Sequence, residues 1–190
     1  MRLFVAVNVP KAERDRIHRA SRPLREGGFP VRWVAPDLIH LTMKFLGEVQ
    51  PTSLPPIETV MEGVAARTPP FIMEIGGLGA FPTIRRPRVL WVGVDPSPAL
   101  RCLKQDLEWA LSDLGFDRET RAFHPHLTLG RAAPGDGAGA FRGLDALASG
   151  VAYSATVSVG DVELMRSHLS ASGPRYEVLS SFALEGPERR

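Results

Sequence analysis

The sequence predicts an α+β fold, in one domain that contains two related halves. Predicted helices alternate with groups of two strands rather than with single strands, which favours antiparallel pairs backed by helices over a doubly wound parallel sheet. No low-complexity linker interrupts the 190 residues, so we expect a single domain over residues 1–190. A short motif, His-Leu-Thr followed by an apolar residue, occurs at residues 40–43 and again at residues 126–129. This repetition indicates two related halves.

The first half of the chain begins with a short apolar run at residues 2–9, which is typical of a buried strand. Residues 11–26 are mostly charged and predict one surface helix. Two strands follow at residues 31–35 and 39–47, and apolar residues alternate in the second of them. Apolar residues at helical spacing then predict a helix over residues 51–67.

The second half contains most of the predicted strands. They cover residues 70–81, 87–94, 126–132, 151–169 and 175–184, the fourth as a strand pair or as one long strand. A proline near the first turn predicts a helix that starts at Asp95-Pro96-Ser97-Pro98 and runs to Leu114. A short helix is expected at residues 141–149, after a glycine-rich loop at residues 133–140.

Composition narrows the class of protein. The chain is 44% apolar and 23% charged, has a net charge of +2, and contains no apolar run long enough to span a membrane. Its N-terminal run lacks a cleavage pattern and is interpreted as a first strand, not a signal peptide. The single cysteine, Cys102, allows no internal disulfide and fits a reducing compartment. We therefore expect a cytoplasmic protein, whose mildly basic charge permits an anionic ligand without requiring one.

The repeated motif predicts a shared polar face. Residues two apart in a strand point to the same side, so His40 lies beside Thr42 and His126 beside Thr128. The alternate positions are apolar and should face the helices: Leu41, Met43, Leu127 and Leu129. If pseudo-twofold symmetry relates the two strands, two imidazoles and two hydroxyls converge in one cleft. The alternative is a pair of amphipathic strands whose polar residues simply face solvent.

Two histidines and two threonines suit phosphodiester chemistry without a metal. One neutral imidazole can remove a proton from water, while a protonated one gives a proton to the leaving oxygen. Histidine fits both roles because its ordinary pKa lies near neutrality. Threonine hydroxyls can donate hydrogen bonds to the non-bridging phosphate oxygens. Arg131, three residues after Thr128, can add a charge-assisted contact.

The paired motifs resemble those of the 2H phosphoesterases. The wider resemblance is to the RNA 2′,3′-cyclic phosphodiesterases of bacteria and archaea, also called 2′-5′ RNA ligases. It is carried by blocks spread over nearly the whole chain, namely RLFVAV, VRWVAPDLIHLTMKFLGEV, PRVLWVGV, FHPHLTLGR and VELMRSHLSASGPRYEVL. The resemblance implies a bilobal 2H phosphoesterase fold with pseudo-twofold symmetry, in which two antiparallel sheets form a central cleft with helices on the outside.

The same resemblance implies a function. The protein would open the 2′,3′-cyclic phosphate at an RNA end to a 2′-phosphate without metal or cofactor, and would support reversible 2′-5′ joining. The matching positions are His40, Thr42, His126 and Thr128 for the chemistry, Arg131 on phosphate and Phe45 beside the nucleotide. We predict His126 as the general base and His40 as the general acid, although the symmetric motif does not itself distinguish them. We expect a monomer without an obligate protein partner.

Residues next to the motifs leave alternatives open. Lys44 is in phase with His40, so it either contacts RNA or is solvated. Phe45 is out of phase unless the strand contains a bulge, so it either packs inward or borders the nucleotide. His124 with His126 could bind a metal, but no third ligand is evident nearby, and the intervening proline is unusual in a central strand.

Aromatic residues outside the motifs have simpler interpretations. Trp33, Trp91 and Phe81 are interpreted as core or sheet-packing residues rather than platforms for a base. Tyr176 either closes one rim of the cleft or packs at a sheet edge.

Two other functions fit the same motif residues. One is a non-catalytic protein that binds phosphorylated nucleotides without turning them over. The other is a 2H phosphodiesterase that acts on another small cyclic phosphate or on oligoadenylate. Comparing turnover of an RNA end with turnover of a mononucleotide separates the substrate classes.

Overall fold

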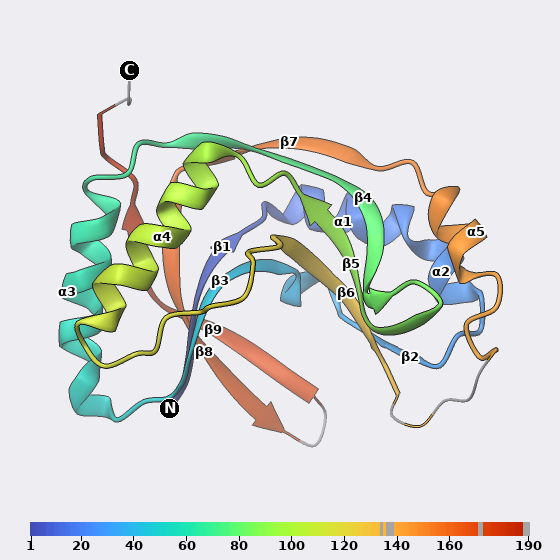
Figure 1. The fold of residues 1–190 in the computed structure, drawn as a ribbon, viewed down its shortest axis with the longest axis horizontal. Coiled ribbons are helices and arrows are strands. Elements are labelled where there is room, and N and C mark those ends of the chain that lie inside the picture. The colour runs from blue at the N-terminus through green and yellow to red at the C-terminus, as the bar shows by residue number, and fades with distance from the viewer. Residues whose placement is uncertain (134, 136–138, 171–172, 188–190) are drawn as a thin grey trace.

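The computed structural model describes residues 1–133, 135, 139–170 and 173–187, and its strands form a nine-stranded sheet (Figure 1). The strands are β1 (Arg2–Asn8), β2 (Val31–Trp33), β3 (His40–Glu48), β4 (Phe71–Thr83), β5 (Arg86–Val94), β6 (His126–Ala132), β7 (Ser154–Val159), β8 (Asp161–Ser170) and β9 (Gly173–Ala183). Their order is β7-β4-β5-β6-β3-β1-β8-β9, with β2 paired to β6 beside this path. The pairings between these strands are antiparallel, which confirms the predicted α+β class.

The sheet consists of two halves that meet at a narrow seam. One half contains β3, β1, β8 and β9, and the other contains β7, β4, β5, β6 and β2. The seam between β3 and β6 is registered by the pair Leu41 and Leu127. The two predicted antiparallel sheets are therefore continuous, but only through this short contact.

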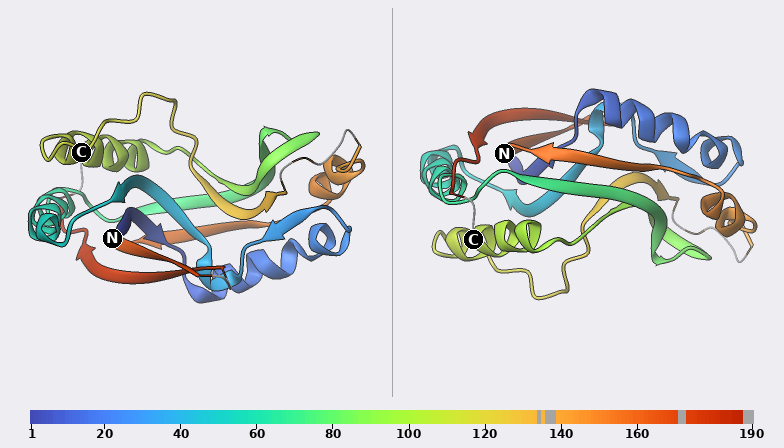
Figure 2. Two further views of the ribbon diagram at one scale, coloured as in Figure 1. Left: turned by 90° about the horizontal axis from the view of Figure 1, so that it is seen from below. Right: turned by 90° about the horizontal axis from the view of Figure 1, so that it is seen from above.

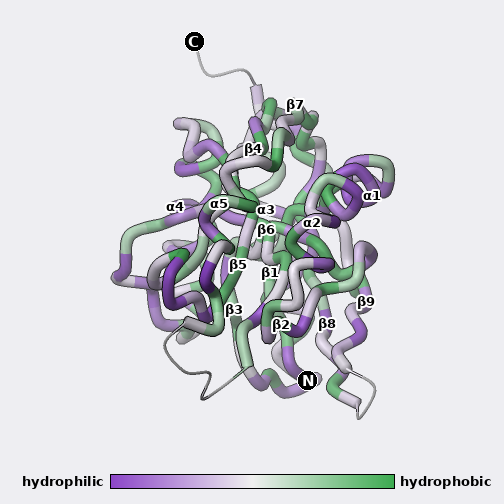
Figure 3. Tube along the Cα trace, turned by 90° about the vertical axis from the view of Figure 1, so that its right-hand side faces the viewer, coloured by the Kyte–Doolittle hydropathy of each residue, from purple (hydrophilic) through white to green (hydrophobic). Residues whose placement is uncertain are grey.

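Five helices pack around the sheet in the described part of the chain (Figure 2). They are α1 (Lys11–Ala20), α2 (Arg22–Glu26), α3 (Leu54–Ala65), α4 (Pro98–Ser112) and α5 (Leu144–Ser149). Helices α3 and α4 contact each other and bury their apolar faces together with the strand residues Leu41, Met43 and Leu127. The predicted inward positions of the two motifs are thus confirmed. Figure 3 shows the same division, with hydrophobic residues along the central strands and a mostly hydrophilic α1.

Two sequence predictions need correction. The single helix predicted for residues 11–26 is two helices that meet at Ser21, because Pro23 has no backbone N–H and its ring clashes with the carbonyl four residues earlier in a continuous helix. The region 151–169 is neither a hairpin nor one long strand. Strand β7 pairs with β4 and strand β8 pairs with β1, so the chain passes at Gly160 from one half of the sheet to the other.

Smaller differences concern the ends of elements. The helix predicted for residues 51–67 begins as a 3₁₀ turn (Pro51–Ser53), followed by α3. Helix α4 starts within the predicted segment Asp95-Pro96-Ser97-Pro98, and Ser97 caps it, since its hydroxyl accepts a hydrogen bond from the backbone N–H of Leu100 at 3.3 Å. Of the predicted loop at residues 133–140, residues 134 and 136–138 lie outside the described part of the chain. No helix of the described residues is long and apolar enough to cross a membrane.

Candidate active site

The two repeated motifs lie side by side across the seam of the sheet. His40 is the first residue of β3 and His126 is the first residue of β6. The buried pair Leu41 and Leu127 faces the helices, so the residues on either side of it face the other way. We call this side of the sheet, which carries both histidines with Thr42 and Thr128, the histidine face. Because the strands are antiparallel, each histidine lies towards the threonine of the other strand.

A β-bulge interrupts both motif strands at the same position. In the pairing of β1 with β3, Ala6 is opposite Thr42 and Val5 is opposite Lys44, so Met43 is the extra residue. After a bulge the alternation of faces shifts by one residue. Met43 and Lys44 are therefore both buried, and Phe45 is exposed.

The second strand repeats this pattern. In the pairing of β5 with β6, Trp91 is opposite Thr128 and Leu90 is opposite Gly130, so Leu129 is the extra residue. Leu129 and Gly130 are both buried, and the next residue, Arg131, is exposed. Phe45 and Arg131 therefore occupy equivalent positions on the histidine face, each five residues after its histidine.

The bulge determines the positions of Phe45 and Lys44, which the sequence left open. Phe45 is 66% exposed, so the interpretation that it packs inward is wrong. Its ring centroid lies 6.2 Å from that of Phe4, which in turn lies 4.9 Å from the ring of His40. Both interpretations of Lys44 are wrong, because this side chain is buried on the other face of the sheet.

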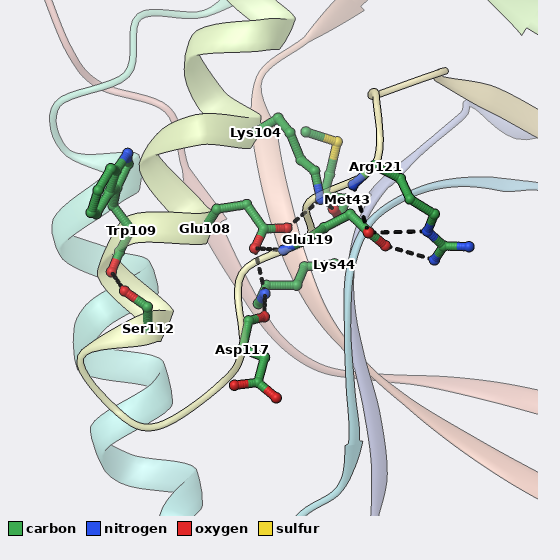
Figure 4. A network of polar contacts seen from close by, with 9 residues as sticks. All are labelled: Met43, Lys44, Lys104, Glu108, Trp109, Ser112, Asp117, Glu119 and Arg121. Atoms are coloured by element: carbon green, nitrogen blue, oxygen red, sulfur yellow. Dashed lines mark hydrogen bonds and ion pairs between the residues drawn. The ribbon is translucent and has the colours of Figure 1, made fainter.

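Lys44 belongs to a buried ion network with α4 (Figure 4). Its ammonium lies 2.5 Å from the Glu108 carboxylate and donates a hydrogen bond to the carbonyl oxygen of Asp117 at 2.7 Å. Lys104 pairs with the same carboxylate and donates to the carbonyl oxygen of Met43 at 2.6 Å. The network therefore holds the bulge of β3 and the segment that follows α4.

The charges in this network favour an ionised Glu108. Burial alone would raise the pKa of this carboxyl, but hydrogen bonds from Lys104, from Lys44 and from the backbone N–H of Glu119 lower the pKa below its ordinary value. The sequence does not predict this network, because Glu108, the ion-pair partner of Lys44, lies on a helix far away along the chain.

Each histidine is oriented by a backbone carbonyl two residues earlier. Nδ1–H of His40 donates to the carbonyl oxygen of Leu38 at 2.8 Å, and Nδ1–H of His126 donates to that of His124 at 2.7 Å. A carbonyl oxygen only accepts, so Nδ1 carries the proton in the neutral ring and Nε2 is left as the proton acceptor. Nε2 of His40 lies 3.0 Å from the hydroxyl of Thr42.

Both imidazoles favour the neutral form in the free protein. Burial lowers the pKa of His40, the bond to Leu38 opposes this shift, and the charges of Arg131 and His126 lower the pKa further. Burial also lowers the pKa of His126, with further lowering by Arg131 and His124. Arg131 thus acts on both rings, and an anionic ligand held here would favour a proton on one of them.

Aromatic rings surround each histidine. The ring of His40 lies 5.1 Å from that of Tyr176, in addition to its contact with Phe4. The ring of His126 lies 5.0 Å from Phe81 and 6.3 Å from Trp91. Phe81 and Trp91, which are expected only to pack in the core or on the sheet, therefore also lie beside the site.

The strand register shows how Trp91 reaches the site. Ala6 is opposite Thr42 in one half, and Trp91 is opposite Thr128 in the other, so β5 is the counterpart of β1. Tyr176 is expected either to close one rim of the cleft or to pack at a sheet edge, and its ring lies against that of His40.

No metal-binding group accompanies the histidines in the described residues. No set of three His, Cys, Asp or Glu side chains that could hold a metal ion is present there. The backbone carbonyl of His124 orients His126. The imidazole ring of His124 lies 6.2 Å from the ring of Phe81.

Known proteins are similar to this chain in sequence and in fold. The 2′-5′ RNA ligase superfamily matches residues 10–171 of the chain. An RNA 2′,3′-cyclic phosphodiesterase of Methanothermobacter thermautotrophicus is 33% identical over 97% of this chain and 99% of its own length. One of Geobacillus stearothermophilus is 35% identical over 96% of this chain, which spans only 57% of that relative.

Solved structures give the same result. A protein of Thermus thermophilus superposes with a TM-score of 0.77 at 30% identity, covering 98% of this chain and 99% of its own. Escherichia coli LigT complexed with 3′-AMP superposes with a TM-score of 0.75 at 28% identity, covering 96% of this chain and 97% of its own. The match to the superfamily extends through both motif strands and over most of the chain, and the chain therefore belongs to the 2′-5′ RNA ligase superfamily.

Proposed function

We propose that this chain hydrolyses the 2′,3′-cyclic phosphate at the end of an RNA to a 2′-phosphate, with its two histidines as acid and base. The observation that carries the proposal is the matched pair of bulged strands. Each presents a histidine, a threonine and, five residues after the histidine, a side chain for the ligand. The relatives named RNA 2′,3′-cyclic phosphodiesterase support this reaction and substrate.

The reaction needs two proton transfers. His126 removes a proton from water through Nε2, and the water oxygen attacks phosphorus. The bond from phosphorus to the 3′-oxygen breaks, and His40 gives that oxygen its proton. Thr42 and Thr128 donate hydrogen bonds to the non-bridging oxygens, where negative charge must be held during attack. With an RNA 5′-hydroxyl in place of water, the same steps give a 2′-5′ linkage.

One contact of His40 supports this direction of proton transfer. Burial and the charge of Arg131 lower the pKa of both rings, so these effects suit a neutral His126 without distinguishing it from His40. His40 has the hydroxyl of Thr42 at its Nε2, so a proton there would be held by a hydrogen bond until it is transferred. We therefore keep His126 as base and His40 as acid.

Phe45 and Arg131 serve different parts of the ligand in this proposal. The exposed ring of Phe45 stacks on the nucleobase, because every base has an apolar face. The guanidinium of Arg131, which is exposed on the histidine face, binds the phosphate through charge-assisted hydrogen bonds.

No step in this scheme uses a metal, since imidazoles perform both proton transfers. We accordingly propose a metal-independent enzyme. We also propose that it acts in the cytoplasm as a monomer, which cell fractionation and light scattering would check.

The test is turnover of 2′,3′-cyclic AMP in excess EDTA, with the products separated by ion-exchange chromatography. Formation of 2′-AMP at an unchanged rate is the expected result. Formation of 3′-AMP would mean that the other bond breaks. Binding without turnover would leave a nucleotide-binding protein, and loss of activity in EDTA would require a metal at His124 and His126.

A further inference from the structure

Strand β2 makes the two halves of the site unequal. It pairs with β6 just beyond the bulge, and Arg32 is directly opposite Arg131. The equivalent part of β3, around Phe45, pairs with β1 and has no such second neighbour in the described residues. Strand β2 thus adds a basic residue beside Arg131 in this half.

Arg32 lies on the histidine face. Directly opposite residues of an antiparallel pair point to the same side of the sheet, so Arg32 shares the side of Arg131. Its two neighbours point the other way. A Cβ added at the buried Gly130 would come within 2.5 Å of Val31 and 3.0 Å of Trp33. Both guanidinium-bearing residues are exposed.

The two arginines have no anionic partner among the described residues. Strands β2, β5 and β6 contain no Asp or Glu, and neither Arg32 nor Arg131 takes part in an ion pair within that part of the chain. Like charges directly opposite each other in a sheet repel. Two adjacent guanidinium groups with no carboxylate between them can bind two phosphate groups of one ligand.

A mononucleotide cannot use both arginines in the same way as an RNA end. In the proposed function the reactive phosphate is held at the two histidines, on the face where Arg131 is exposed. The one remaining anionic group of an RNA end near this site is the phosphodiester on the 5′ side of the terminal nucleotide. A 2′,3′-cyclic mononucleotide lacks that group.

We propose that Arg32 binds this upstream phosphodiester and so lets the protein favour RNA ends over cyclic mononucleotides. This inference rests on the proposed function, because it takes the histidines as the place of the reactive phosphate. Arg32 then determines specificity through a backbone contact and carries no base preference.

The experiment compares two substrates in the wild type, Arg32→Ala and Arg88→Ala. The substrates are 2′,3′-cyclic AMP and a short oligonucleotide with a 2′,3′-cyclic phosphate end. Arg88 is the matched control. It precedes Val89, the residue directly opposite Arg131, and therefore points to the other face of the sheet. Arg32→Ala should raise KM for the oligonucleotide about tenfold and leave KM for cyclic AMP unchanged. Arg88→Ala should change neither.

Salt dependence gives a second readout. The slope of log KM against log salt concentration for the oligonucleotide should fall by about one in Arg32→Ala. Arg32→Lys keeps the charge and should keep the wild-type slope. Equal losses on both substrates, or a loss on neither, would overturn the inference.

Failure of the inference is distinguishable from failure of the proposed function. The wild-type protein either turns over cyclic AMP or does not, whatever Arg32 does. If it does not, fluorescence anisotropy with the same oligonucleotide ending in a 2′-phosphate still measures the contact. Arg32→Ala would then have to weaken binding about tenfold relative to Arg88→Ala for the inference to stand.

Discussion

The two motif strands reach the same geometry with different residues. In β3 the bulge is followed by Lys44, and in β6 by Gly130, and both residues are buried on the helix side of the sheet. Lys44 is stabilised there by Glu108 and by a backbone carbonyl. Gly130 is accommodated because it has no side chain, and Val31 and Trp33 occupy the space beside it.

This comparison separates what the site requires from what it tolerates. The backbone irregularity is common to both halves, because it turns the fifth residue after each histidine onto the histidine face. The means of stabilising the bulge differ, with an ion network in one half and close packing in the other. The exposed residues also differ, an aromatic ring at Phe45 and a cation at Arg131, so the two halves can bind different parts of one ligand.

Removal of either imidazole should have the largest effect on turnover. His40→Ala and His126→Ala should each lower kcat for 2′,3′-cyclic AMP by about 10²–10⁴-fold, since each removes one proton transfer. His18→Ala, on the outer helix α1, serves as control. An effect in only one of the two variants would contradict the equivalence of the halves.

The ion network of the first half can be broken separately. Glu108→Gln leaves the buried Lys44 and the partly buried Lys104 beside a neutral group, and should lower the free energy of unfolding by about 3–5 kcal/mol. Urea denaturation measures this change. The control Glu119→Gln removes an exposed pair with Arg121 and should leave the midpoint almost unchanged. Equal midpoints for both variants would show that the network does not stabilise the bulge.

The packing of the second half has its own test. Gly130→Ala would place a Cβ 2.5 Å from Val31, so strand β2 must shift, at a cost of about 1–3 kcal/mol. Thermal unfolding measures the loss. In Gly150→Ala the added Cβ would come no nearer than 3.5 Å to its neighbours, so this control should be tolerated. A Gly130→Ala protein as stable as the control would contradict the close packing.

Phe45 should affect binding but not folding. Its 66% exposure means that Phe45→Ala loses little packing, whereas loss of stacking should weaken nucleotide binding by about 1–3 kcal/mol. Calorimetry with 2′-AMP measures the affinity. Ile72→Ala truncates another exposed apolar residue, on β4, and should not change it. Unchanged affinity in Phe45→Ala would leave the ring without a role in binding.

Arg131 should shift the pH dependence. It lowers the pKa of both histidines, so Arg131→Ala should raise both values and move the profile of kcat/KM towards higher pH. The level of kcat/KM should also fall, but only the position of the profile tests the electrostatic effect. A profile that falls in height without moving would mean that Arg131 does not act on the rings.

The sequence predicts the shared face of the motif residues, because these residues follow the simple alternation of a strand. His40 with Thr42 and His126 with Thr128 need no information beyond a period of two. Phe45 and Lys44 illustrate the limit. Strict alternation places Lys44 on the histidine face, and the bulge reverses the two assignments.

Long-range partners explain the rest of what sequence analysis missed. Lys44 finds Glu108 from a helix 64 residues away, and no local pattern records this pairing. The position of Arg32 opposite Arg131 depends on which strand β2 joins, which its three residues do not determine. Pro23 predicts the break between the two helices at Ser21, whereas the continuous run of charged residues favours one helix over residues 11–26.

The central claim is that two equivalent strands supply one base and one acid to a single site. The most direct test is the pH dependence of kcat/KM for 2′,3′-cyclic AMP in excess EDTA, for the wild type, His126→Ala and His40→Ala. The wild type should give a bell-shaped profile. His126→Ala should lose the fall on the acidic side, and His40→Ala should lose the fall on the alkaline side. A wild-type profile with a single limb, or variants that keep both limbs, would contradict the account.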